Sequence, residues 1–119
     1  MTERQRAALH RLLTGLFEPG AEFRHGDCIG ADAEAGEMAF ELGWTVIIHP
    51  PIDPQYRAFS PYFHEMMPER DYHQRNMDIV NNSDLLVAAP RSLTDQRGGT
   101  WWTIRYAQKR GIPIIILYP

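Results

Sequence analysis

The chain has 119 residues, 44% of them hydrophobic, and a formal net charge of -3. This size and composition predict one domain, residues 1–119, with a substantial core. The acidic balance argues against a dedicated nucleic-acid-binding protein, because such domains usually carry a basic face.

The first half of the chain predicts two helices that alternate with two strands. Apolar side chains recur about every 3.6 residues over 3–17, which predicts a helix, and Thr2 can cap its start. This charged segment is neither a signal peptide nor a membrane span, so we expect a soluble cytoplasmic protein with no membrane partner. The elements that follow are a weak strand at 21–25, a helix at 32–42 and a buried strand at 44–49.

The second half opens with a proline-rich, aromatic segment, residues 50–74, that has no clean periodicity. A long irregular connection of this kind is often a lid or a binding loop. The remaining elements are a short helix over "QRNMDIVNNSD", a buried strand over "LLVAAP" (85–90), a helix over "WWTIRYAQKR" and a final buried strand over "PIIILYP".

Strands therefore alternate with helices, and the strands are continuously apolar. This pattern is typical of a parallel sheet that is covered on both faces. We expect an α/β fold with three layers and a mainly parallel four-stranded sheet. A sheet this small leaves edges and apolar helix faces to cover, so we also expect a homo-oligomer.

Three loops follow the carboxyl ends of predicted strands, where open parallel sheets bind their ligands. They are "HGDCIGAD", the segment that leads to "QRN", and "APRSLTDQRGGT". We expect these loops to meet on one rim of the sheet.

The first loop combines glycines and aspartates. Gly26 and Gly30 would let backbone N–H groups approach a ligand closely. Asp32 stands where a helix N-cap belongs. Asp27 either accepts hydrogen bonds from a ribose or a base, or stabilises the turn through its own side chain.

The third loop ends in "RGGT" directly before a helix. Gly98 and Gly99 free the backbone, Thr100 offers a hydroxyl, and the helix dipole favours an anion that Arg97 could clamp. The alternative is a plain glycine loop in which Thr100 is the N-cap.

Arg75 and Asn76 open the helix before the 85–90 strand. They either reach a phosphate and a loop or ligand, or cap the helix and pair with the acidic run "PERD". Trp101 and Trp102 both pack in the core, or one of them lies beside the rim and stacks on a base.

Two histidines end predicted strands. His25, His49 and Asp27 would form a metal site if they met, but their spacing matches no local ligand motif, so we expect no metal ion and no cofactor. Cys28, the single cysteine, cannot form an internal disulfide and is interpreted as a small filler rather than a nucleophile.

Taken together, "GDCIGADAEAGEMAFELG", "RNMDIVNNSDLLVAAP" and "RGGTWWTIRYAQKRGIPIII" resemble the Rossmann-like SLOG superfamily over residues 26–118. This group includes the DprA-like DNA-processing proteins and the lonely-guy phosphoribohydrolases, and the likeness is greatest to its small bacterial and phage members. The resemblance implies a nucleotide or nucleotide-derived ligand. It makes these residues the pocket: Gly26, Asp27, Gly30, Asp32, Arg75, Asn76, Gly98, Gly99 and Thr100.

The chain departs from that pattern in two places. Many relatives begin with an extra strand whose Gly-Ser-Arg-type loop forms part of the nucleotide site, whereas this sequence starts with a predicted helix. The phosphoribohydrolases carry glutamates just after their Gly-Thr, where this chain has Trp102 and Thr103.

Two functions compete. The first is a binding module that senses or sequesters a nucleotide-like ligand, held by Arg75, Arg97 and the 98–100 backbone. The second is a hydrolase of N-glycosidic bonds, in which Asp27, or else Glu69 or Asp71, supplies the catalytic carboxylate. Nucleic-acid binding ranks below both because the chain has no basic stripe.

Overall fold

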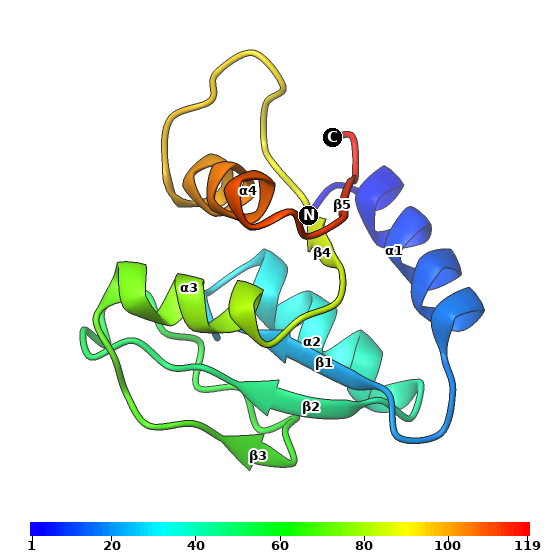
Figure 1. The fold of residues 1–119 in the computed structure, drawn as a ribbon. Helices are drawn as coiled ribbons and strands as arrows, with labels where there is room; N and C mark the ends of the chain where they lie inside the picture. The colour runs from blue at the N-terminus through cyan, green and yellow to red at the C-terminus, as the bar shows by residue number, and fades with distance from the viewer.

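The computed structural model describes residues 1–119 and arranges four helices and five short parallel strands in an α/β fold (Figure 1). The helices are α1 (Glu3–Leu16), α2 (Ala31–Glu41), α3 (Tyr72–Asn81) and α4 (Gly99–Arg110). The strands are β1 (Glu22–His25), β2 (Thr45–Ile48), β3 (Glu65–Met66), β4 (Leu86–Ala88) and β5 (Ile114–Ile116). None of the helices combines the length and the apolar character that crossing a bilayer requires.

The strands form two sheets instead of the expected single four-stranded sheet. One sheet has the order β1-β2-β3 and the other pairs β4 with β5, and every pairing is parallel. The expectation of parallel strands is confirmed, and the expectation of one four-stranded sheet is wrong. The observed sheets differ from the expected one in two ways. β1 and β4 are not hydrogen-bonded to each other, and the additional strand β3, inside the 50–74 segment, pairs with β2.

Two hydrophobic clusters lie on opposite faces of the strands. The first joins α1 and α2 to β2 through residues such as Leu9, Ala39 and Val46. The second joins α3 and α4 to β4 through residues such as Val80 and Ile104. Helices therefore pack against the strands through two separate clusters, with α1 and α2 in one and α3 and α4 in the other.

Helix α1 begins at a capping box and is fastened to the β4–β5 sheet by one buried side chain. The Thr2 hydroxyl accepts from the Gln5 N–H at 3.0 Å, and the Gln5 side chain accepts from the Thr2 N–H at 3.0 Å. Gln5 Nε2 also donates to the Pro90 carbonyl at 2.8 Å and to the Leu117 carbonyl at 3.1 Å. Gln5 thereby ties the start of α1 to both strands of the smaller sheet.

Replacing Gln5 with methionine should lower the free energy of unfolding by about 2–4 kcal/mol. The change keeps the length of the side chain but leaves two buried carbonyls without their donor, and each such loss costs roughly 1–3 kcal/mol. Urea unfolding measures the difference. The control is Gln108→Met on the exposed face of α4, which should shift stability by less than about 0.5 kcal/mol. Equal effects of the two substitutions would contradict a role for Gln5 in holding α1.

Candidate functional site

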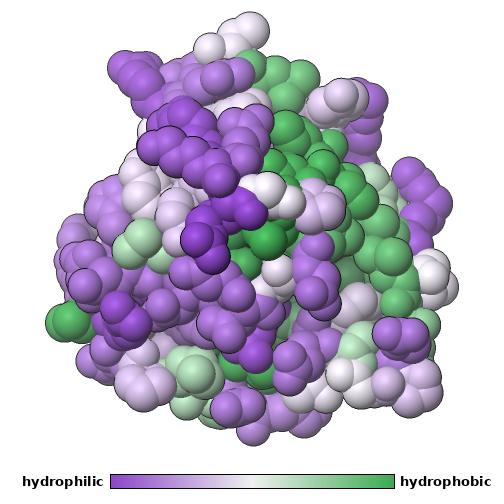
Figure 2. All heavy atoms as spheres, viewed as in Figure 1, coloured by the Kyte–Doolittle hydropathy of each residue, from purple (hydrophilic) through white to green (hydrophobic).

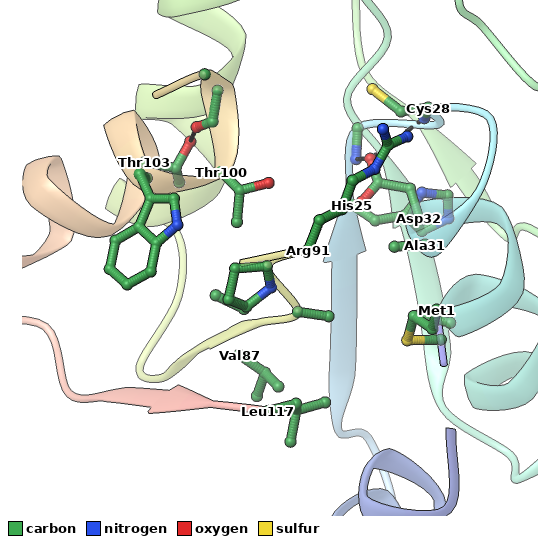
Figure 3. Close-up of a pocket in the computed structure, with 18 of the residues that line it drawn as sticks. Met1, His25, Cys28, Ala31, Asp32, Val87, Arg91, Thr100, Thr103 and Leu117 are labelled. Carbon is green, nitrogen blue, oxygen red and sulfur yellow. Dashed lines mark hydrogen bonds between the residues drawn. The ribbon is translucent and has the colours of Figure 1, made fainter. Parts of the chain in front are cut away.

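A cleft of about 810 Å³ opens between the two sheets and carries the predicted rim. Figure 3 shows its walls: Thr100 on α4 faces Cys28 of the turn after β1 and Asp32 of α2, with Val87 and Leu117 at the apolar end of the cleft. Eight of the ten predicted site residues line this cleft: Gly26, Asp32, Arg75, Asn76, Arg97, Gly98, Gly99 and Thr100. The turn after β1 and the "RGGT" segment, far apart in sequence, therefore share one cavity. Asp27 and Gly30 are the two that do not line it.

Arg75 is the most deeply buried charged group of the cleft, with 2% of its surface exposed. Its Nη1 donates to the Gly26 carbonyl and, at 3.1 Å, to the His49 carbonyl, while its Nε donates to Asn76 Oδ1 at 2.8 Å. Arg75 forms no ion pair with any carboxylate of the chain. The predicted alternative, a pair with the "PERD" run, is therefore absent, and the guanidinium keeps an uncompensated positive charge.

Gly26 makes room for this guanidinium. A Cβ atom at this position would overlap Nη1 and Cζ of Arg75. The glycine after β1 is therefore needed for the close approach of the Arg75 side chain, and the approach places the guanidinium at the carboxyl ends of β1 and β2.

Asp32 shapes the turn after β1 rather than capping α2. The N-cap of α2 is Gly30, which makes no side-chain cap bond, and Asp32 lies in the first turn of the helix. Its Oδ2 accepts from the Gly26 N–H at 3.1 Å and from the Cys28 N–H at 3.2 Å. Asp32 therefore does not cap α2 as expected. Its side chain binds the preceding turn and holds the 26–28 backbone in place.

Asp27 points away from the cleft and binds the 50–71 segment. Its backbone is left-handed, with φ 58°, and its carboxylate is fully buried in an ion pair with Arg57, whose Nε lies 2.9 Å away. The Ser60 N–H donates to the same carboxylate at 3.1 Å. The geometry therefore gives Asp27 a structural role in the loop and gives no support to the predicted catalytic or ligand-binding role.

The N-terminus of α4 faces the cleft without a capping side chain. Its N-cap is Gly98 instead of the expected Thr100, and no acidic residue lies in its first turn. Gly99 packs so closely on the Tyr72 hydroxyl that a Cβ there would overlap it. The first N–H groups of α4 and the Thr100 hydroxyl therefore remain free for an anion.

Arg97 is held by its own loop. Its side chain is 91% exposed, and its Nε and Nη2 donate to the two carboxylate oxygens of Asp95, both at 2.9 Å. This bidentate pair raises the pKa of Arg97 and lowers the pKa of Asp95. Arg97 therefore lines the cleft as part of a neutral pair rather than as a free cation.

Arg91 is a cleft residue that the sequence analysis missed. It lies shortly after β4, separated from it by Ala89 and Pro90, lines the cleft and points toward Cys28 and Asp32 (Figure 3). It forms no ion pair with any carboxylate of the chain. The signal was present in the sequence, because Arg91 is the first residue after the apolar run of a predicted strand and so begins a loop at its carboxyl end.

The two strand-end histidines are neutral. Nδ1 of His25 accepts from the Asp27 N–H at 2.9 Å, its Nε2 has no partner, and burial lowers the pKa of His25. His49 Nε2 lies 3.0 Å from Arg24 Nη1, and burial together with that guanidinium lowers the pKa of His49 to about 4. No group of three or more His, Cys, Asp or Glu side chains is arranged to hold a metal ion.

A second cavity of about 720 Å³ is also lined by Arg75. It shares Cys28, Tyr72 and Arg75 with the cleft, and the Arg75 guanidinium lies 5.0 Å from the centre of the Tyr72 ring. Burial raises the pKa of the Cys28 thiol, which keeps it protonated and agrees with its interpretation as filler rather than nucleophile.

The adjacent tryptophans separate as neighbours on a helix must. Trp101 lines the cleft, and its Nε1 donates to the Ser92 carbonyl at 3.1 Å. Trp102 packs elsewhere, with its ring stacked on Tyr106 and edge-on to His73. One tryptophan therefore lies beside the rim and the other does not.

Comparisons of the chain with protein-family models, with curated proteins and with solved structures found no match.

Asp27→Asn should lower the free energy of unfolding by about 2–4 kcal/mol. The amide removes the fully buried charge that pairs with the partly buried Arg57, and breaking such a pair on one side is costly. Urea unfolding measures the loss, and limited proteolysis should show earlier cleavage within 50–71. The matched control is Asp95→Asn, which breaks an exposed pair and should cost less than about 1 kcal/mol. Similar losses for the two variants would show that the Asp27 carboxylate does not anchor the loop.

Stability should fall as the pH drops from about 6.5 to about 4. His49 titrates near pH 4 in the folded chain but near 6.5 when unfolded, so the unfolded chain binds more protons in this window. The loss from His49 is at most about 3 kcal/mol, and His25 shifts in the same direction. Urea midpoints measured across this range should decline less steeply for His49→Gln than for the wild type. The exposed His10→Gln serves as control, and parallel curves for all three proteins would refute the assignment.

Proposed function

We propose that the carboxyl-end rim binds a nucleotide or a nucleotide-derived phosphorylated ligand, for sensing or sequestration. The observation that carries this proposal is the buried Arg75 guanidinium, which lines the cleft and has no anionic partner in the chain. An unpaired buried charge is costly, and a bound phosphate would compensate it with charge-assisted hydrogen bonds.

Two further features of the cleft favour an anion. Arg91 adds a second guanidinium without an ion-pair partner. The uncapped N-terminus of α4 presents backbone N–H groups at the positive end of the helix dipole. Three sources of positive potential thus border the same cavity, and they come from three separate segments of the chain.

The size and lining of the cleft favour a nucleotide over a free phosphate ion. At about 810 Å³ the cavity is in the range of small-molecule sites. Trp101 and apolar residues of β4 line it beside the polar rim, which suits a ligand with an aromatic base and a charged end. The motif resemblance to the Rossmann-like SLOG superfamily points to the same ligand class.

Binding is favoured over N-glycosidic hydrolysis by the positions of the carboxylates. Hydrolysis requires a carboxylate that can stabilise an oxocarbenium-like state or activate water. Asp27 is committed to Arg57, Asp32 accepts from two backbone amides, and Asp95 pairs with Arg97. These three carboxylates are therefore engaged by partners in the protein, and the alternative candidate Asp71 lines the second cavity rather than the cleft.

Calorimetric titration with AMP, ADP and NAD, each compared with adenosine, tests the proposal. Phosphorylated ligands should bind, and adenosine should bind more weakly by at least tenfold. Arg91→Ala should weaken AMP binding by roughly 1–3 kcal/mol, the range of a charge-assisted hydrogen bond, without unfolding the protein, because Arg91 is exposed. Arg110→Ala, at the exposed end of α4, should leave affinity unchanged. Equal binding of AMP and adenosine, or no binding of any of these ligands, would contradict a nucleotide-phosphate site.

A further inference from the structure

One side chain of α3 contacts both Arg75 and the N-terminus of α4. Tyr72 is the first residue of α3 and stands three positions before Arg75, so the two side chains lie on the same face of the helix. The Arg75 guanidinium lies 5.0 Å from the centre of the Tyr72 ring. At the far end of that ring, Oη packs against Gly99, the first residue of α4. Tyr72 therefore lies between two of the three sources of positive potential that border the cleft.

The glycine at position 99 is explained by the Tyr72 hydroxyl and not by backbone conformation. Gly99 does not have a positive φ angle, but a Cβ atom at this residue would overlap Tyr72 Oη. Gly26 is its counterpart, because it also lacks a positive φ angle and a Cβ there would overlap the Arg75 guanidinium. Each of these two glycines thus admits one side chain of α3 to the rim.

The Tyr72 hydroxyl has no hydrogen-bond partner within the chain. The other tyrosine of the α3–α4 pair, Tyr106, donates its hydroxyl to Asn81 Oδ1 at 3.0 Å. Tyr72 Oη instead faces Gly99, and 43% of the residue is exposed. Packing explains the ring, because a phenylalanine ring would make the same contact with Arg75. Packing does not explain a hydroxyl that needs a glycine opposite it and bonds to no protein group.

An anion at the start of α4 would meet donors of three kinds. The N–H groups of Gly99 and Thr100 have no acceptor within the helix. Arg75 is 2% exposed, has no carboxylate partner, and its Nη2 has only a weak contact with Cys28 Sγ at 3.7 Å. Tyr72 adds a neutral O–H donor that contacts both. The free helix N-terminus is thus joined by a buried guanidinium whose charge nothing in the chain compensates.

The polar end of the cleft is the end that Tyr72 borders. Apolar side chains gather over β4 and β5 and are bordered by hydrophilic ones (Figure 2), and Val87 and Leu117 line the apolar end of the cleft (Figure 3). Cys28 lies at the other end in Figure 3, and Arg75 and Tyr72 lie beside it. A nucleotide that places its base among the apolar side chains therefore brings its phosphate to Tyr72.

We propose that Tyr72 is a phosphate-binding residue of this cleft. Its hydroxyl donates a hydrogen bond to a phosphate oxygen, and its ring holds the Arg75 guanidinium in place. The assignment rests on the proposed function and adds a ligand contact that this function does not by itself require. Arg75 and Arg91 attract any anion, whereas a neutral hydroxyl adds affinity only where an acceptor oxygen lies within hydrogen-bond reach. Tyr72 therefore fixes the position of the phosphate, which charge alone does not.

Calorimetric titration of Tyr72→Phe with AMP and with adenosine tests the assignment. The change removes the hydroxyl but keeps the ring and its contact with Arg75. The affinity for AMP should fall about tenfold, because one hydrogen bond to a charged acceptor is lost, and the affinity for adenosine should stay unchanged. The matched control is Tyr106→Phe, which removes a hydroxyl that bonds to Asn81 and does not line the cleft. It should leave both affinities unchanged.

A spectroscopic measurement detects the contact directly. In protein labelled with 3-fluorotyrosine, the fluorine resonance that is missing from Tyr72→Phe belongs to Tyr72. AMP and inorganic phosphate should move this resonance, and adenosine should move it less. A Tyr72 resonance that AMP and phosphate leave in place would overturn the assignment.

The remaining outcomes separate this assignment from the nucleotide proposal. AMP binding that weakens in Arg91→Ala but not in Tyr72→Phe would refute the role of Tyr72 and leave the nucleotide proposal standing. Equal losses for AMP and adenosine in Tyr72→Phe would also refute it, because they would indicate a packing role. An unmodified chain that binds neither AMP nor inorganic phosphate would contradict both proposals.

Discussion

The buried guanidinium of Arg75 is the interaction on which the site depends. It bonds to the carbonyls of Gly26 and His49 and to the Asn76 side chain, so one residue of α3 gathers the carboxyl ends of β1 and β2. Desolvating a guanidinium costs several kcal/mol, and neutral carbonyls compensate only part of that cost. The same contacts that organise the rim therefore leave a positive charge beside the cleft, and this is the physical basis for expecting an anion there.

Asp27, one residue along from Gly26, has the opposite arrangement. Its carboxylate is buried with its counter-ion Arg57 and a backbone donor from Ser60, so its charge is compensated within the protein. The left-handed backbone at Asp27 separates the two environments. Gly26 faces the cleft and Asp27 faces the 50–71 segment, so adjacent residues of one motif serve binding and loop anchoring separately.

The sequence could predict those features that depend on periodicity or on chain order. The α1 pattern, the apolar runs of β2 and β4, and the convergence of the Gly26 and Gly98 loops at strand ends all follow from such rules. Three features could not be predicted. A continuous apolar run indicates that a strand is buried but not which strand lies beside it, so the sequence could not predict the gap between β1 and β4. Glu65 and Met66 are too few and too exposed to mark β3. The direction of the Asp27 side chain depends on a single φ angle that an Asp-rich turn does not specify.

The arrangement of the two sheets and the anion site are mechanically connected. Gly26, whose carbonyl binds Arg75, follows β1, and Arg91 follows β4. The distance between these two strands therefore sets the distance between the guanidinium groups of Arg75 and Arg91. A phosphate that bridged the two guanidinium groups would favour one value of that spacing, so binding at the rim would act on the packing of one sheet beside the other.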